Sequence, residues 1–181
     1  MVEMDDIYLK MAPEDIPWNM EEPPEELVEL VESGRVRPCR AVDLGCGAGN
    51  NAVYLAGKGF EVTGIDISPA AIKLAEENAS KKGVECKFIA ADLTSGLGLD
   101  ERFDFAFEWE VLHHLFPEKR VKYVENVSGL LNQGGLYLSV CFSEDDDPAF
   151  GGPGKYRTTK LGTELYFSSE KEIEEDRKSV V

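Results

Sequence analysis

The residues best suited to chemistry are three glycines at alternate positions, Gly45, Gly47 and Gly49, which follow a short apolar stretch containing Asp43. Glycine has no side chain, so it lets the backbone take positive φ angles and pass close to a ligand. A helical pattern follows, and the start of a helix offers unpaired N–H groups and the positive end of its dipole. The segment therefore predicts a nucleotide-type cofactor site. The alternative is an ordinary glycine-rich turn between a strand and a helix.

The spacing of the glycines separates two classes of cofactor. Dinucleotide-binding folds use G-x-G-x-x-G, in which the third glycine allows the helix to pack on the strand. Here Asn50 stands at the position of that third glycine. The next predicted strand, residues 61–65, is followed by Asp66, at the spacing expected of a carboxylate that binds a ribose. Asp66 suits any adenosine cofactor, whereas the glycine spacing argues against NAD.

Strand and helix patterns alternate along the chain, which is typical of an α/β fold with a parallel sheet and right-handed crossovers. Ser68 and Pro69 have the composition of a helix start, and Gly83 that of a helix end. We expect helices at 25–32, 51–58, 69–82 and 117–131, and strands at 40–44, 61–65, 86–90, 103–108 and 136–142. Beyond these we expect a polar loop, a short hairpin within 155–167 and a charged helix over 170–178.

In this order the motifs resemble those of the class I S-adenosylmethionine-dependent methyltransferases. The matching segments are the acidic glycine loop 43–49, the acidic residues Asp66 and Asp92, and the fourth and fifth motifs at 103–115 and 130–136. The resemblance covers roughly residues 40–142. It implies a Rossmann-like three-layer sandwich with a mainly parallel sheet of order 3-2-1-4-5. The short sequence after residue 142 implies that the family's C-terminal hairpin is incomplete or atypical.

The resemblance also implies that S-adenosylmethionine binds at the carboxyl ends of strands one, two and four. Asp43 would order the glycine loop, and Asp66 would accept hydrogen bonds from both ribose hydroxyls. Glu108 would lie near the amino group of the methionine part. The implied cofactor-binding set is Asp43, Gly45, Cys46, Gly47, Gly49, Asp66, Ile67, Asp92, Leu93 and Glu108.

Adenine recognition is implied at two further places. Ile67 would lie against the ring, while Asp92 would accept from the adenine amino group and the Leu93 N–H would donate to the ring. Each assignment has a structural alternative. Asp66 would then cap a helix, Asp92 would be a turn residue, Ile67 would pack, and Glu108 would lie at a solvated edge.

The catalytic group is left unassigned. Methyl transfer from a sulfonium requires alignment, desolvation and a place for the acceptor's proton. His113, His114 and Glu110 follow the fourth predicted strand and are the weak candidates for that role. A neutral imidazole near physiological pH is the right chemical type. Packing or capping is the alternative for each histidine, and a solvated edge is the alternative for Glu110.

The N-terminal segment resembles the thiopurine and thiol S-methyltransferase-like branch, in which a Pro-Trp pair precedes the first helix. Here the pair is Pro17-Trp18, although Asn50 stands where that branch has an arginine. The resemblance implies that Trp18 is a lid or acceptor-pocket residue, with cover of an apolar surface patch as the alternative. It also implies a small acceptor, with a thiol as the candidate, because a thiol with a pKa of about 8.5 needs little activation.

Composition restricts the partners. The 181 residues include 35 acidic and 19 basic side chains, for a net charge of −16. Such a chain repels phosphate backbones, so we expect a small-molecule acceptor and no nucleic acid. No apolar stretch reaches the ~20 residues that cross a bilayer, and the N-terminus lacks a secretion pattern. We therefore expect a cytoplasmic monomer or homodimer with no membrane partner.

Cysteine and histidine usage argues against disulfides and metals. The four cysteines contain no C-x-x-C pair and lie in or beside predicted buried strands, as free thiols would. The chain has only two histidines, and we expect no metal site.

Its length favours one domain over residues 1–181. The expected parts are an N-terminal lid and helix (1–36), a cofactor-binding core (40–142), and a mobile loop with an irregular C-terminal segment (143–181). A cofactor-binding protein that acts through a partner without catalysis is the alternative function, and a nucleotide-binding oxidoreductase is a remote third.

Overall fold

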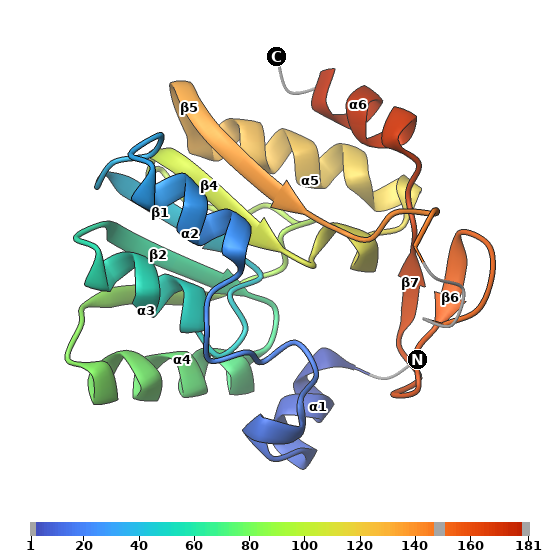
Figure 1. Cartoon of the computed structure of the whole chain (residues 1–181), viewed down its shortest axis with the longest axis horizontal. Coiled ribbons are helices and arrows are strands. Elements are labelled where there is room, and N and C mark those ends of the chain that lie inside the picture. The colour runs from blue at the N-terminus through green and yellow to red at the C-terminus, as the bar shows by residue number, and fades with distance from the viewer. Residues whose placement is uncertain (1–2, 147–150, 179–181) are drawn as a thin grey trace.

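The computed structural model describes residues 3–146 and 151–178, and its centre is a parallel sheet of five strands (Figure 1). The strands follow the order β3–β2–β1–β4–β5, which confirms the predicted topology. They are β1 (Arg40–Leu44), β2 (Glu61–Asp66), β3 (Cys86–Ala90), β4 (Phe103–Trp109) and β5 (Leu131–Val140). Because every neighbouring pair is parallel, all five carboxyl ends lie at the same edge.

Helices cover both faces of the sheet, as Figure 1 shows for α2 and α3 on one side and α5 on the other. Alternate strand residues enter two separate cores. Ala41 and Phe105 pack with α2 (Glu25–Glu32) and α3 (Asn50–Gly57), whereas Val42 and Ala106 pack with α5 (Pro117–Leu130). Strands buried on both faces are typical of parallel sheets. The predicted three-layer sandwich is confirmed.

The capping residues set the bounds of α4 (Pro69–Lys82) as predicted. The Ser68 hydroxyl oxygen accepts a hydrogen bond from the Ala71 N–H at 3.0 Å, which satisfies one of the first free N–H groups of the helix. Gly83 ends the helix with a φ of 67°. A glycine adopts this left-handed conformation without the steric cost that a side chain would bring.

Strand β5 differs from its prediction, since it begins at Leu131 rather than at residue 136 and ends at Val140 rather than at residue 142. Leu131 pairs with Phe103, and Leu136 pairs with Phe105. Between these two pairs β5 advances by five residues while β4 advances by two. The extra residues include Gly134 and Gly135, which precede the predicted start of the strand. They form an irregularity within the strand instead, because its partner continues beside it.

Two short N-terminal elements lack a counterpart among the sequence predictions. They are the helix α1 (Met4–Lys10) and the 3₁₀ turn η1 (Pro13–Asp15). Ile7, Tyr8 and Ile16 form an apolar cluster with Ala71 of α4. This cluster docks the N-terminal segment beside the start of α4, near the carboxyl edge of the sheet (Figure 1).

The C-terminal segment contains the predicted hairpin and helix. Strands β6 (Tyr156–Thr158) and β7 (Glu164–Tyr166) pair antiparallel, and α6 (Glu170–Lys178) follows. Residues 147–150, which belong to the loop expected after β5, lie outside the described residues. Figure 1 shows α1 and the hairpin beyond the end to which the strands of the sheet point.

Candidate functional site

The glycine loop after β1 lies at the carboxyl edge of the sheet and touches three other parts of the chain. Its glycines all have positive φ, 72°, 52° and 77° at Gly45, Gly47 and Gly49. A Cβ atom on any of them would come too close to a neighbouring side chain. The neighbours are Val111 after β4 for Gly45, Tyr8 of α1 for Gly47 and Ala75 of α4 for Gly49.

Four N–H groups of this loop already donate hydrogen bonds within the protein. Those of Gly45 and Cys46 donate to one carbonyl oxygen of β2, at 2.7 and 3.0 Å. The Gly47 N–H donates to the Asp66 carboxylate at 2.9 Å, and the Gly49 N–H donates to the Cys46 carbonyl oxygen at 2.8 Å. These four N–H groups are therefore not free to donate to a ligand on the loop.

Asp66 ends β2 next to the loop, with a side chain only 8% exposed. Its two carboxylate oxygens accept from the Gly47 N–H and from the Ser68 N–H, at 2.9 and 2.8 Å. Burial raises the pKa of Asp66 despite these bonds. The Ser68 hydroxyl, not Asp66, accepts from Ala71 inside α4. The following Ile67 is 57% exposed, which leaves an apolar side chain uncovered beside the loop.

Asp43 is buried in β1 below the loop. Burial and, to a smaller extent, the negative charge of Asp66 raise the pKa of Asp43 to about 7. The Asp43 carboxylate accepts from the Ala52 N–H in the first turn of α3, so it ties the strand to the helix across the loop. Within the described residues its Oδ2 atom has no hydrogen-bond partner. An unpartnered buried carboxylate oxygen is costly, so a donor or a cation there would be favourable.

Asp92 and Leu93 follow β3. The Asp92 carboxylate accepts from the N–H and hydroxyl of Thr94 at 2.8 and 2.7 Å, and from the Ser95 hydroxyl at 3.0 Å. The Leu93 carbonyl oxygen accepts from Asn126 of α5 at 2.8 Å. These bonds fix the turn after β3. Contact of either residue with adenine stays a prediction.

Glu108 is fully buried at the end of β4. Its carboxylate accepts from the N–H groups of Val111 and Leu112, at 2.8 and 3.3 Å, and from the Ser139 hydroxyl of β5. Burial raises the pKa of Glu108 to about 7. Glu108 therefore holds the turn that leaves β4, rather than lying at a solvated edge. Its predicted contact with the methionine amino group stays a prediction.

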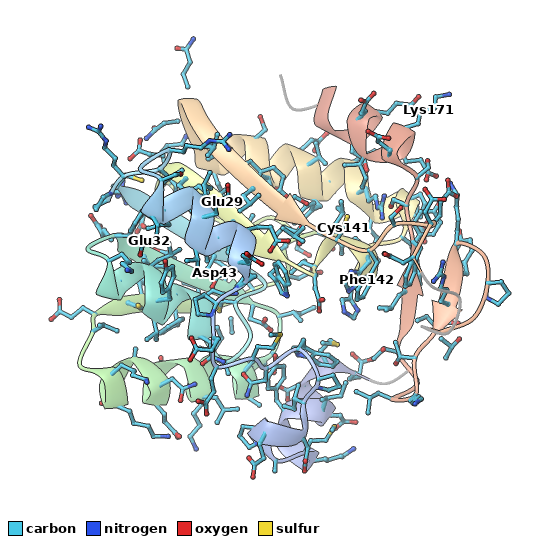
Figure 2. All side chains as sticks on the ribbon, viewed as in Figure 1. Glu29, Glu32, Asp43, Cys141, Phe142 and Lys171 are labelled. Carbon is cyan, nitrogen blue, oxygen red and sulfur yellow. The ribbon has the colours of Figure 1, made fainter. Side chains whose placement is uncertain are left out.

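The two histidines lie in η2 (Leu112–His114), within a chain of aromatic rings. Trp18 is edge-on to His114, with centroids 6.4 Å apart, and His113 stacks on Phe142 at 4.3 Å. Phe142 lies between the end of β5 and the hairpin (Figure 2). Burial lowers the pKa of His114 to about 4 and lowers that of His113 as well. We call Trp18, His114, His113 and Phe142 the aromatic wall. Both imidazoles in it are neutral at physiological pH.

Glu110 stands between β4 and η2 with a φ of 61°, and it is the one residue other than glycine with a positive φ in the described part of the chain. Such a conformation is strained and recurs at functional sites. Burial raises the pKa of Glu110. Its N–H donates to Val140 of β5 at 2.8 Å, which holds the strained position.

Two residues with clear roles in this geometry were missed by the sequence predictions. Tyr8 lies over Gly47, and Arg120 of α5 is buried beneath η2. Arg120 donates to the carbonyl oxygens of Leu112 and Leu115, at 3.3 and 2.9 Å, so it fixes the turn that carries the histidines. The pattern of α5 gave no signal for Arg120, because a charged residue there is usually exposed.

The described residues contain neither a candidate membrane-spanning helix nor a candidate metal cluster. None of the helices there is both long and apolar enough to cross a membrane. No group of three or more histidine, cysteine, aspartate or glutamate side chains there is arranged to hold a metal ion.

With this geometry in place, comparison with known proteins identifies the family. Residues 41–135 match the methyltransferase domain family, which is just over half of the chain, so the protein belongs to that family. The matched range begins in β1, includes the glycine loop, Asp66, Asp92 and the histidines, and ends within β5. The predicted class of protein is confirmed.

Individual relatives agree with this assignment. The chain is 31% identical over 142 residues to 2-heptyl-1-hydroxyquinolin-4(1H)-one methyltransferase of Mycobacteroides abscessus, an alignment that covers 76% of the chain and 62% of the relative. It is 28% identical over 139 residues to probable thiol methyltransferase 2 of Arabidopsis thaliana, covering 76% and 60%. The chain therefore spans less than two thirds of either relative's length.

A solved structure gives the same fold. Burkholderia thailandensis 1,6-didemethyltoxoflavin-N1-methyltransferase, with 1,6-didemethyltoxoflavin and S-adenosylhomocysteine bound, superposes with a TM-score of 0.71 at 24% identity. The match covers 92% of this chain and 70% of that one. The likeness confirms the fold, and the family match supports the prediction of S-adenosylmethionine as the cofactor.

Proposed function

We propose that this protein transfers a methyl group from S-adenosylmethionine to a small-molecule acceptor. The observation that carries the proposal is the arrangement around the glycine loop, where buried Asp66 and exposed Ile67 stand side by side at the carboxyl end of β2. A carboxylate suits ribose hydroxyls, and an uncovered apolar side chain suits the face of a purine. The alternative is a cofactor-binding protein that acts through a partner without catalysis.

The residues present fit the cofactor. When bound, S-adenosylmethionine supplies a methyl group that its positive sulfonium has already activated for displacement. The unpartnered oxygen of Asp43 marks a place where an ammonium or other donor would be favourable. Asp66 and Glu108 both raise the pKa of Asp43, so the three acidic side chains lie near one another at this edge of the sheet. A positively charged cofactor suits such surroundings.

The acceptor side is formed by the aromatic wall. Its rings come from the N-terminal segment, from η2 and from the segment after β5, so three separate parts of the chain contribute. An imidazole whose pKa is about 4 is a weak proton acceptor. That favours acceptors that ionise without help near neutral pH. A thiol fits this requirement, since its pKa is about 8.5 and the sulfur is intrinsically nucleophilic.

A hydroxyl on a heteroaromatic ring is the second candidate acceptor. A planar ring stacks favourably against aromatic side chains, and Trp18, His114 and Phe142 of the wall are only partly buried. One relative is named for a hydroxyquinolinone acceptor. A hydroxyl of this kind is acidic enough to ionise without a strong base, as a thiol does. We keep both acceptors within the same proposed reaction.

Two measurements test the proposal in turn. Calorimetric titration with S-adenosylmethionine and with NAD should give binding for the first and none for the second. Turnover is then followed by mass spectrometry with a panel of aryl thiols and N-hydroxyquinolinones, with S-adenosylhomocysteine as the common product. No binding of S-adenosylmethionine would overturn the proposal. Tight binding without turnover on either class would favour the non-catalytic alternative.

We further propose that residues 1–181 act as one domain in which the N-terminal segment is a lid, with Trp18 at its inner face. The docking of Tyr8 and Ile16 against Ala71 supports this assignment. The net charge of −16 supports a small-molecule acceptor over a nucleic acid. A cytoplasmic monomer or homodimer remains our expectation, and sedimentation of the purified protein distinguishes the two states.

A further inference from the structure

The hydroxyl of Tyr8 stands directly over the glycine loop. A Cβ atom on Gly47 would lie 2.7 Å from the Tyr8 oxygen, so nothing separates the hydroxyl from the loop backbone. The Tyr8 side chain is 8% exposed and packs with Ile7 and Ile16 against Ala71. A residue far from the loop in sequence thus presents one polar atom to the region that the cofactor would occupy.

Tyr8 is held in place from two sides. The Trp18 indole N–H donates to the Tyr8 hydroxyl oxygen at 2.9 Å. One turn earlier in α1, the Asp5 carboxylate accepts from the Ser68 hydroxyl at 2.7 Å and from the Ala70 N–H at 2.9 Å. The Ser68 N–H in turn donates to the Asp66 carboxylate at 2.8 Å. These bonds therefore fix α1 relative to the carboxylate predicted to bind ribose.

Within the described residues, the Tyr8 hydroxyl accepts a hydrogen bond and its own proton is available for donation to a ligand. A tyrosine hydroxyl both donates and accepts, and in the described residues Tyr8 accepts from Trp18. Burial and, to a smaller extent, the negative charge of Asp66 raise the pKa of Tyr8, so the hydroxyl keeps its proton. The N–H groups of Gly45, Cys46, Gly47 and Gly49 are already used inside the protein. The Tyr8 O–H is thus a donor beside a loop in which four N–H groups are engaged.

The chemistry of the cofactor indicates which group this donor meets. S-adenosylmethionine carries one anionic group, the carboxylate of its methionine part. Around the loop the ionisable neighbours Asp5, Asp43 and Asp66 are themselves acids, so an anion there needs a neutral donor. The ribose hydroxyls are donors and suit Asp66, whereas a carboxylate is an acceptor and suits an O–H.

We propose that the Tyr8 hydroxyl donates a hydrogen bond to the carboxylate of S-adenosylmethionine, which makes α1 part of the cofactor site. This inference rests on the proposed function, because it requires that the cofactor bind to the glycine loop. It assigns to the N-terminal helix a direct contact with the donor, in addition to the lid role of Trp18. No covalent bond is made or broken in this contact, and the proton stays on Tyr8.

The test compares two ligands that differ only in the carboxylate. S-adenosylhomocysteine carries it, whereas S-adenosyl-3-thiopropylamine lacks it and keeps the amino group. Calorimetric titration of the Tyr8→Phe variant should show about tenfold weaker binding of S-adenosylhomocysteine, the loss expected for one hydrogen bond to a charged group. Binding of S-adenosyl-3-thiopropylamine should change less than about twofold.

Tyr54→Phe is the matched control. Tyr54 lies in α3, and its hydroxyl has no hydrogen-bond partner within the described residues, so its removal should leave both affinities unchanged. Equal losses for both ligands in Tyr8→Phe would show that Tyr8 only supports the fold, and no loss for either would also overturn the inference. Wild-type protein that binds neither ligand would overturn the proposed function, and this inference with it.

Discussion

Trp18 lies edge-on to His114, with the two ring centroids 6.4 Å apart, although 95 positions separate the residues in the sequence. The contact joins the N-terminal segment to the turn after β4. Trp18 also donates to Tyr8, so one indole ring touches both the histidine turn and the residue that lies over the glycine loop. The predicted lid residue therefore has a structural partner on each side.

The first prediction concerns the proton acceptor. Because burial lowers the pKa of His114 to about 4, this imidazole is a poor base, and His114→Ala should reduce kcat on aryl thiols less than about tenfold. His113→Ala should also keep kcat within that range, but it should destabilise the fold, since His113 is 2% exposed and stacked on Phe142. Stopped-time product assays and urea unfolding measure the two effects. A loss of kcat beyond a hundredfold in His114→Ala would identify it as the general base.

The second prediction concerns the ribose carboxylate. Asp66→Ala should weaken S-adenosylmethionine binding by roughly 2–3 kcal/mol, because two charge-assisted hydrogen bonds are lost. The substitution also frees the Gly47 and Ser68 N–H groups, so Asp66→Asn is a gentler companion variant. Asp100→Ala, an exposed carboxylate in the connection before β4, is the control. Unchanged affinity in a folded Asp66→Ala protein would remove Asp66 from the site.

The third prediction separates backbone strain from lost space. Gly47 and Gly83 both have positive φ, 52° and 67°, but only Gly47 has a neighbour within 4 Å of an added Cβ. Both alanine variants should lose about 1 kcal/mol of unfolding free energy from strain. Only Gly47→Ala should also weaken cofactor binding, because its Cβ displaces the Tyr8 hydroxyl, and Gly47→Val should be worse. Equal affinities in the two alanine variants would show that the approach of Tyr8 is unimportant for binding.

The fourth prediction uses opposite pKa shifts. Burial raises the pKa of Asp43 to about 7, so between about pH 4 and 7 the folded protein binds more protons at this site than the unfolded chain does. The contribution of Asp43 to stability therefore falls as pH rises through that window. His114 is shifted downward, so the unfolded chain binds more protons there between about pH 4 and 6.5, and its contribution rises with pH.

Urea unfolding of Asp43→Asn and His114→Phe against wild type at pH 5, 6 and 7 tests these signs. Relative to wild type, Asp43→Asn should gain stability as pH rises, by at most about 1.4 kcal/mol per pH unit. His114→Phe should gain relative stability as pH falls. The wild-type curve alone is uninformative, because the two groups oppose each other. Parallel slopes for the two variants would contradict the prediction.

The core of the fold was predictable because its signals are local. Ser68, Pro69 and Gly83 mark the ends of α4 by their own chemistry, and the structure places the helix at Pro69–Lys82 as the pattern indicates. The order of the five strands followed from family resemblance and was confirmed. The start of β5 was not predictable in this way. Its Gly134-Gly135 pair has the composition of a turn, and only the pairing with β4 keeps it inside the strand.

The candidate site was predictable only where its residues belong to the motif segments. Asp66 follows from its spacing after the loop and Asp43 from the family resemblance, and both lie at the loop. Tyr8 belongs to a seven-residue helix, too short for a periodic pattern, and it acquires a role only through packing on Ala71. Sequence spacing gives no measure of such a contact. The carboxylates of Asp92 and Glu108 were predictable as site candidates, but not their hydrogen bonds to neighbouring turns.

Arg120 makes the turn of the histidines depend on the C-terminal segment. Its guanidinium holds the turn of the histidines, and it in turn faces the ring of Tyr166 at 5.0 Å and the carboxylate of Asp176 at 3.4 Å. The strands that hold the glycine loop take all their partners from residues up to β4. The histidine turn is also braced, through Arg120, by β7 and α6. Loss of the C-terminal segment would therefore loosen the histidine turn and leave the glycine loop supported.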